Sequence, residues 1–271
     1  MPDVAASSPR VGGLLREWRQ RRRLSQLDLA LEAGISTRHL SFVETGRSRP
    51  STEMVLHLAE QLDVPLRDRN QLLLAAGHAP VFGQRGLDEP EMEPVRDALA
   101  LILDGHSPYP ALVVDRHWGL VMANEAVGVL IAGCAPELLE PPVNVLRLSL
   151  HPDGMAPQIV NFGQWRAHLL DRLGREFVTT GDPALAALHE ELAALPGART
   201  GEALESHAGD IAVPLRIRVG NAELSFISTV TTFGTATDVT LAELSVEAFY
   251  PVDTSTAEAL ATLVSARVEQ G

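Results

Sequence analysis

The side chains best suited to recognition chemistry gather in one short segment of the chain. Arg38 can meet a guanine edge with two parallel N–H donors, and Phe42 can pack on a thymine methyl group. Small hydroxyls and further arginines nearby can bind a base or a phosphate. The residues predicted to contact double-stranded DNA are Gln26, Ser36, Thr37, Arg38, Ser41, Phe42, Arg47 and Arg49. The alternative is that Arg38 is merely solvated, as an isolated Arg on a helix usually is, and that Phe42 belongs to the core. The helices and turns around these residues distinguish the two interpretations.

Those elements follow a cap, turn and cap pattern. Ser25 is placed to cap a helix at 26–33, and Gly34 can adopt the left-handed conformation that ends it. Ser36 then caps a helix at 37–45, in which Leu40 and Val43 continue the apolar face. With helices at 11–22, 52–62 and 66–76, the pattern predicts an all-α domain of about five helices over residues 10–76. Two short helices meeting at a glycine indicate a helix-turn-helix, whose second helix enters the major groove.

Residues 14–66 resemble the Cro/C1-type (XRE) helix-turn-helix family of repressor domains. The resemblance implies that Arg19 in the first helix and Glu44 near the end of the third form a buried structural ion pair, and that neither contacts DNA. Removing one partner of such a pair typically costs about 3–5 kcal/mol.

The charge is divided unevenly along the chain. The net charge is −13, yet residues 1–76 carry 11 Arg against 9 Asp and Glu, whereas the remainder carries 11 Arg against 26. Only the N-terminal domain suits a polyanion such as DNA, and the acidic remainder weakens nonspecific attraction to it. DNA binding should therefore depend more on base contacts and on dimer formation. Every Lys or Arg position is Arg, a side chain that can bind guanine or phosphate through two parallel hydrogen bonds. The simpler explanation is codon bias in a GC-rich genome, because the preference for Arg extends over both domains.

After a Gly- and Pro-containing linker at 77–90, residues 91–271 alternate between helical and strand patterns. An amphipathic helix at 91–104 precedes two short strands within 111–124, and Asn124 is placed to cap a helix at 125–132. Helices at 158–180 and 183–195, three strands at 211–219, 222–232 and 240–249, and a last helix at 255–268 follow. Five strands with interposed helices predict an α+β domain with an antiparallel sheet.

That order is similar to a PAS fold, and several motifs extend the likeness. They resemble those of the MmyB-like regulators and lie at 38–42, 145–148, 151–154, 161–165, 224–226, 231–235, 238–241 and 250–253. The resemblance covers nearly the whole chain. It implies a DNA-binding regulator whose PAS-like domain holds a lipid-like ligand such as a fatty acid.

The residues themselves also allow an apolar cavity between the sheet and its helices. The large side chains placed to line it are Trp118, Leu120, Met122, Phe162, Trp165, Leu169, Phe226 and Phe233. Four polar residues beside apolar runs, any of which could bind a carboxylate head group, are Arg147, His151, Asn161 and Arg172. The alternatives are that the large side chains fill the core completely, and that the polar ones bond to backbone or to acidic neighbours.

Signatures of catalysis are missing from the sequence. His189-Glu190-Glu191 lacks the second His of a zinc-binding helix, and neither a Gly-rich phosphate loop nor a Gly-x-Ser-x-Gly elbow occurs. The single Cys134 rules out an internal disulfide and a Cys-based zinc site, and an inert thiol fits it better than a redox sensor. We expect no cofactor beyond a bound lipid-like effector, no metal, no membrane span and a cytoplasmic protein.

Three functions remain to be compared. The first is a transcription regulator, more commonly a repressor, that binds its operator as a homodimer and responds to a small apolar ligand. The second, a DNA-binding domain fused to an enzyme, lacks a catalytic constellation. The third is a DNA-binding protein whose second domain only dimerises or binds another protein.

Overall fold

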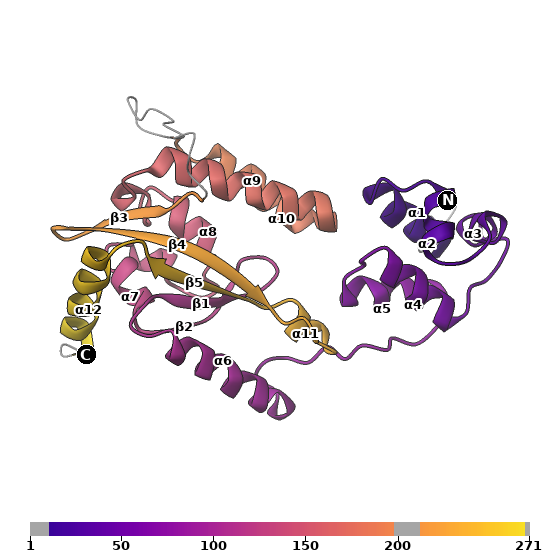
Figure 1. Ribbon diagram of the computed structural model, residues 1–271, viewed down its shortest axis with the longest axis horizontal. Coiled ribbons are helices and arrows are strands. Elements are labelled where there is room, and N and C mark those ends of the chain that lie inside the picture. The colour runs from indigo at the N-terminus through magenta and orange to yellow at the C-terminus, as the bar shows by residue number, and fades with distance from the viewer. Residues whose placement is uncertain (1–10, 198–211, 269–271) are drawn as a thin grey trace, which may run out of the picture. The chain divides into compact units, whose positions relative to one another are not determined.

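The computed structural model describes residues 11–197 and 212–268. They form two compact units, one built from the N-terminal helices and the other around a sheet (Figure 1). The predicted domain limits at 10 and 271 and the predicted strand start at 211 lie outside the described residues.

The first unit is the predicted five-helix domain. Its helices are α1 (Val11–Arg21), α2 (Gln26–Glu32), α3 (Thr37–Glu44), α4 (Thr52–Gln61) and α5 (Leu66–Ala75). Ser25, Ser36 and Ser51 cap α2, α3 and α4 by accepting a backbone N–H with the side-chain oxygen, as the sequence predicts. The core is closed by fully buried side chains from every helix, among them Leu15, Leu29, Leu40, Val55 and Leu72.

A buried ion pair joins the first and third helices, as the family resemblance implies. The Nε and Nη2 atoms of Arg19 donate to the two carboxylate oxygens of Glu44 at 2.7 and 2.9 Å. Both residues are less than one tenth exposed. Arg19 also donates to the Leu24 carbonyl between α1 and α2. The pair therefore fixes the end of α3 relative to both preceding helices.

Close backbone packing supports the same contact. A Cβ atom at Gly12 would overlap the carbonyl oxygens of Val43 and Glu44, whereas one at Gly13 would meet nothing within 4 Å. Helix α1 can approach the last turn of α3 only because residue 12 has no side chain.

The second unit contains a five-stranded antiparallel sheet with strand order β2-β1-β5-β4-β3. Its strands are β1 (Ala111–Val114), β2 (Leu120–Ala123), β3 (Leu215–Val219), β4 (Ala222–Thr232) and β5 (Ser245–Pro251). Central strand β5 pairs with both β1 and β4, so segments more than 100 residues apart in the chain become neighbours. This confirms the predicted α+β class and the five-stranded sheet.

Helices cover the sheet on two sides (Figure 1). On one side lie α7 (Val127–Leu130), α8 (Val145–Leu150), α9 (Phe162–Thr180) and α10 (Pro183–Ala194). Helix α6 (Glu93–Gly105) packs against β1 from the other side, and α12 (Thr254–Val268) packs on β4. Short helices complete the unit: η1 (Pro90–Met92), η2 (Pro136–Leu138) and η3 (Ala156–Gln158). Helix α11 (Val239–Ala242) is grouped with the first unit.

Four local predictions in this unit are wrong. Strand β3 begins at Leu215 rather than at 211, because residues 212–214 are described and lie outside any strand. Strand β5 begins at Ser245 rather than at 240, because residues 239–242 form α11. Helix α9 begins at Phe162 rather than at 158, because η3 occupies the preceding segment. Asn124 does not cap a helix at 125–132. Its side chain accepts from the Ala111 N–H at 3.1 Å and donates to the Tyr109 carbonyl at 2.8 Å, and only α7 follows it.

The ion pair yields a first prediction. Replacing Glu44 by Leu leaves a buried guanidinium without its anion, so the first unit should lose about 3–5 kcal/mol of stability. Amide hydrogen exchange in α1–α3 measures this unit separately from the other. The double variant Arg19→Met/Glu44→Leu should recover most of the loss, and equal destabilisation in both variants would contradict the assigned role.

The glycine pair yields a second prediction. Gly12→Ala should destabilise the first unit by about 1–3 kcal/mol, because two backbone carbonyls must shift. Gly13→Ala is the matched control on the same helix and should be neutral or stabilising by up to about 1 kcal/mol. The same exchange measurement tests both, and equal effects would argue against close packing at Gly12.

Candidate functional site

Helix α3 presents the predicted recognition residues on the face opposite its core residues. Leu40 and Val43 are fully buried, whereas Arg38 is exposed and Thr37, Ser41 and Phe42 are half-buried. The Ser36 hydroxyl accepts from the His39 N–H at 3.1 Å, so its first role is to cap the helix. The side chains of Thr37, Arg38, Ser41 and Phe42 are therefore at least partly exposed to solvent.

Phe42 forms a platform for two guanidinium groups. The Arg38 and Arg47 guanidinium carbons lie 5.3 and 5.8 Å from the centre of the Phe42 ring. These distances are within the range of a cation–π contact. Phe42 is half-buried, and it gathers one arginine of α3 and one from the loop after it on the same surface.

Two predicted phosphate ligands already have partners within the first unit. Gln26 donates through Nε2 to Glu44 Oε2 at 2.7 Å, which leaves the second amide hydrogen for another acceptor. Arg49 donates through Nε to the Ala76 carbonyl at 3.0 Å, at the end of α5. Both side chains stabilise the first unit whether or not they also bind phosphate.

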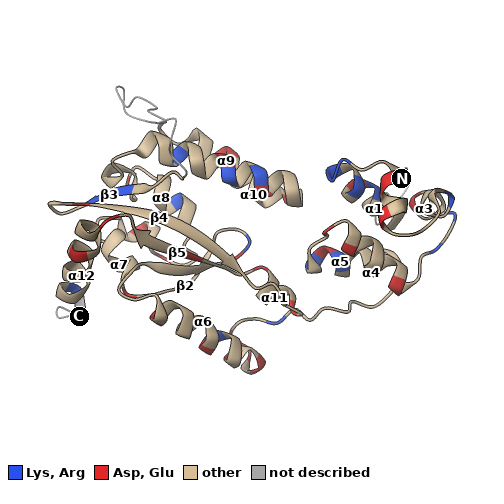
Figure 2. Ribbon diagram, in the orientation of Figure 1, with Lys and Arg blue, Asp and Glu red and all other residues tan. Residues whose placement is uncertain are grey.

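The two units differ in the sign of the charges that cluster on them. Figure 2 shows Lys and Arg colouring at the turn between α1 and α2 and around the end of α3, while α6 in the second unit is mainly acidic. The arginines concerned include Arg21, Arg22 and Arg23 at the turn and Arg47 and Arg49 after α3. This agrees with the division of charge in the sequence.

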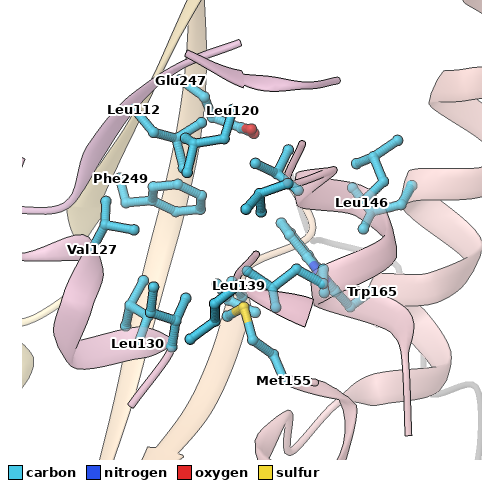
Figure 3. Close-up of a pocket in the computed structure, with 17 residues that line it drawn as sticks. Leu112, Leu120, Val127, Leu130, Leu139, Leu146, Met155, Trp165, Glu247 and Phe249 are labelled. Atoms are coloured by element: carbon cyan, nitrogen blue, oxygen red, sulfur yellow. The ribbon is translucent and has the colours of Figure 1, made fainter. Parts of the chain in front are cut away.

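The second unit contains an apolar cavity of about 180 Å³ between the sheet and helices α7, α8 and α9. Figure 3 shows side chains from both layers pointing into it. The lining residues are Leu112, Leu120, Val127, Leu130, Ile131, Leu139, Val143, Val145, Leu146, Leu148, Ser149, Met155, Trp165, Leu169, Leu215, Glu247 and Phe249. An engineered protein cavity of about 150 Å³ with such a lining holds benzene, so this one has room for a compact organic molecule.

Of the apolar residues predicted to line a cavity, the structure brings Leu120, Trp165 and Leu169 to this one. Trp165 is 3% exposed, and its indole N–H donates to the Ser149 hydroxyl oxygen at 3.0 Å. This bond satisfies the polar atom of the ring, which leaves its apolar surface for the cavity.

Met122 is kept out of the cavity by a β-bulge. Leu120 pairs with Val114 and Met122 pairs with Val113, with a register shift between the two pairs. Paired residues share a face of the sheet, so the shift places Leu120 and Met122 on opposite faces although they are two residues apart.

The other aromatic residues that were predicted to line the cavity lie in the core or at its edges. Phe226 is fully buried and meets Phe249 edge-on, with ring centres 6.4 Å apart. Phe162 is buried in the same core at the start of α9. Trp118 is buried beside the β1–β2 turn, and Phe233 is half-buried after β4. None of these four is among the residues that line the cavity.

The four polar candidates for a head-group ligand are bound to other parts of the chain. Arg147 binds Glu191 through two bonds of 2.6 and 2.8 Å, and this contact lowers the pKa of Glu191. His151 Nδ1 accepts from the Asp153 N–H, and Asn161 bridges the Pro214 carbonyl and the Arg216 N–H. Arg172 binds Glu247 at 3.2 Å. The structure therefore favours the alternative in which these groups bond to backbone or to acidic neighbours.

Sequence reasoning missed Glu247 and Phe249, which lie side by side on the cavity face of β5. The available signal was alternation: residues 247 and 249 share one face of any strand that contains both. An acidic residue on the same strand face as a buried Phe is unusual. This combination indicated that a polar group faces the interior.

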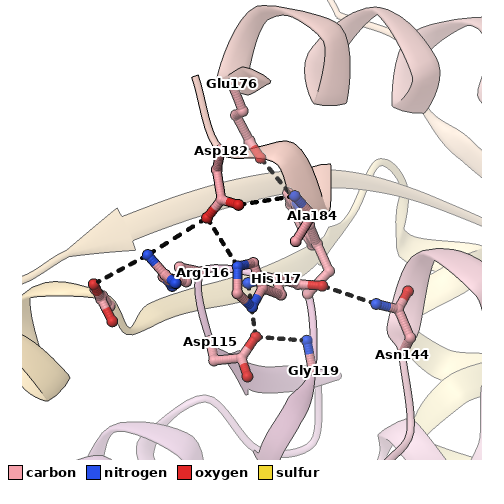
Figure 4. Close-up of polar contacts among 10 residues, drawn as sticks. Asp115, Arg116, His117, Gly119, Asn144, Glu176, Asp182 and Ala184 are labelled. Carbon is pink, nitrogen blue, oxygen red and sulfur yellow. Dashed lines mark hydrogen bonds and ion pairs between the residues drawn. The ribbon is translucent and has the colours of Figure 1, made fainter. Parts of the chain in front are cut away.

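A polar network joins the β1–β2 turn to the end of α9 and the start of α10 (Figure 4). Asp182, the N-cap of α10, accepts from His117 Nε2 at 2.9 Å and pairs with Arg116 at 3.4 Å. Burial would raise the pKa of Asp182, but these contacts and the Ala184 N–H lower it below its ordinary value. Trp118, which follows His117 in the turn, donates its indole N–H to Glu176 on α9 at 2.9 Å.

The described residues give no support to a metal site, a membrane span or a reactive thiol. In residues 11–197 and 212–268, no cluster of three His, Cys, Asp or Glu side chains could hold a metal ion. Over the same ranges, every helix is too short or too polar to cross a membrane. Cys134 is half-buried, and burial raises the pKa of its thiol, which disfavours the reactive thiolate.

Comparison with known families agrees with both units. Residues 15–68 match the helix-turn-helix family model, and residues 95–263 match the model of the MmyB-like transcription regulator ligand binding domain. A search of curated proteins gave no match. The second family model alone covers more than half of the chain. The chain therefore belongs to the MmyB-like transcription regulators and is a DNA-binding regulator with a C-terminal ligand-binding domain.

Proposed function

We propose that this regulator binds an apolar, fatty-acid-like molecule in the cavity of its second, PAS-like domain, and that the ligand modulates operator binding by the first. The observation that carries the proposal is the cavity itself, whose lining is aliphatic and aromatic apart from Ser149 and Glu247. Ligand sites typically combine such a lining with a few polar groups that fix orientation. Repression is the more common mode for such a DNA-binding domain, and we propose it here.

Recognition of the operator is assigned to the outward face of α3. Arg38 is the candidate for guanine, and Phe42 supports it from beneath. The arginines that follow α3 and the hydroxyls on its outward face supply contacts to phosphate or bases.

We further propose a homodimer, because a single reading helix spans too few base pairs for specific control. The exposed apolar face of α6 favours this helix as a contact: Leu101 is 74% exposed and Ile102 is 43% exposed. A ligand that alters the geometry of a dimer changes the spacing of its reading helices, and so changes its affinity for two fixed half-sites. A second domain that serves only for dimerisation is the competing function.

The DNA assignment yields a third prediction. Arg38→Ala should lower specific binding by about 1–3 kcal/mol and relax the preference at one base pair, while the fold is retained. Binding is measured by fluorescence anisotropy on a duplex selected by the wild-type protein from a random pool. Arg16→Ala, an exposed arginine on α1, is the control and should keep the base preference. Unchanged preference in Arg38→Ala would remove Arg38 from the reading surface.

The cavity assignment yields a fourth prediction. Leu139→Trp should fill part of the cavity and weaken uptake of an aliphatic ligand about tenfold or more, with little loss of stability because Leu139 is only half-buried. Leu138→Trp, at a neighbouring position that does not line the cavity, is the control. Uptake is followed by mass spectrometry of organic extracts and by titration calorimetry. Equal uptake by both variants would place the bound ligand outside the cavity, whereas no uptake by the wild-type protein would favour a second domain that only dimerises.

A further inference from the structure

Glu247 is the single ionisable side chain among the described residues that line the cavity. It lies on the central strand β5, between Leu112 of β1 and Val230 of β4, and is 5% exposed. Figure 3 shows its carboxylate at the end of the cavity near Leu112 and Leu120. A molecule that enters the cavity therefore meets aliphatic walls along its length and a carboxyl group at this end.

The groups around Glu247 are already engaged with one another. Arg172 on α9 lies 3.2 Å from the Glu247 carboxylate and 3.4 Å from that of Glu176. The Arg172 guanidinium also rests on the Trp118 ring, 4.2 Å from its centre. The Ser228 hydroxyl on β4 hydrogen-bonds to Glu247. Arg172 thus already pairs with two carboxylates and contacts an aromatic ring, and it is poorly placed to bind a third anion.

The ionisation of Glu247 reflects opposing influences. Burial raises its pKa above the ordinary value for Glu, and the nearby Glu176 adds to this, while Arg172 and Ser228 act in the opposite direction. A hydroxyl group suits either ionisation state, because it can donate to the carboxylate or accept from the protonated acid. A ligand carboxylate suits only the protonated state, because two carboxylates sharing a site cannot both stay ionised.

Resting on the proposed function of the cavity, and narrowing its fatty-acid-like ligands to uncharged ones, we infer that Glu247 selects a neutral apolar molecule with a hydroxyl head group, in preference to a fatty carboxylate or an alkylammonium ion. The hydroxyl oxygen forms a hydrogen bond with Glu247, and the hydrocarbon part fills the space between β1, β5 and helices α7–α9. An alkylammonium is disfavoured because Arg172 already supplies the positive charge at this end, and a second cation would be buried beside it.

The test compares octanol, octanoate and octylamine, three probes with one chain and different head groups, on the full-length protein. Titration calorimetry at slightly alkaline pH keeps octanoate anionic and octylamine cationic. Octanol should bind about tenfold or more tightly than either ion. Equal or tighter binding of octanoate or octylamine would overturn the inference. Failure of all three to bind would overturn the proposed ligand cavity as well.

A proton count separates the role of Glu247 from simple hydrophobicity. Octanoate binding by the wild-type protein should be coupled to proton uptake, because Glu247 must be protonated in that complex, and the uptake is measured by calorimetry in buffers of different ionisation enthalpy. Glu247→Gln should abolish the uptake and strengthen octanoate binding relative to octanol, because an amide can donate to the ligand carboxylate. Glu223→Gln, on the exposed side of β4, is the matched control and should behave as the wild type.

The comparison of probes on the wild-type protein stands even if Glu247→Gln fails to fold. With a folded variant, an unchanged ratio of octanol to octanoate affinity would overturn selection by Glu247, whereas loss of the preference would support it.

Discussion

The ion pair between Arg19 and Glu44 is the interaction on which the first unit depends. Each charge is buried and so needs the other, and Gln26 of α2 adds a third partner to the same carboxylate. One carboxylate near the end of α3 thereby sets the position of α1, α2 and α3 together. The outward face of α3 has a defined direction because its inward face is fixed in this way, and Gly12 permits the close approach that the geometry demands.

The second unit solves a different problem. Its core is a layer of large apolar side chains, yet the sheet and the helices α7–α9 do not meet completely, and a cavity remains. An unfilled apolar space lowers stability, so a chain that keeps one does so at the expense of packing. Placing Glu247 at its end is a further departure from an ordinary core. Both departures fall at the same place, as expected where function limits stability.

The first unit was largely predictable because its signals are local. Ser25, Ser36 and Ser51 lie next to the helices that they cap, and all helix bounds agree to within one residue. In the second unit the hairpin strand β4 was predicted with both ends correct, since Gly220 marks the turn before it. Asn124 failed because its partners, Ala111 and Tyr109, become near only when β1 and β2 pair.

The cavity was only partly predictable, since its lining depends on which faces meet in three dimensions. Periodicity placed Met122 with Leu120, but the β-bulge separated them. Arg172 was predicted as a possible ligand for a head group, yet in the structure it binds Glu247, which is 75 residues away, and this pairing could not be read from spacing. Predictions made residue by residue therefore identified the part of the domain in which the cavity lies. The structure showed which of these side chains contact one another.

The platform of Arg38, Phe42 and Arg47 has a consequence for the entropy of association. Long, flexible side chains usually lose freedom when a partner immobilises them, at a cost of about 0.5–1.5 kcal/mol each. Here two guanidinium groups already rest on one aromatic ring before any partner is present. Part of that freedom is lost during folding, where the hydrophobic core compensates for it, so the surface of α3 meets its partner with its arginines partly ordered.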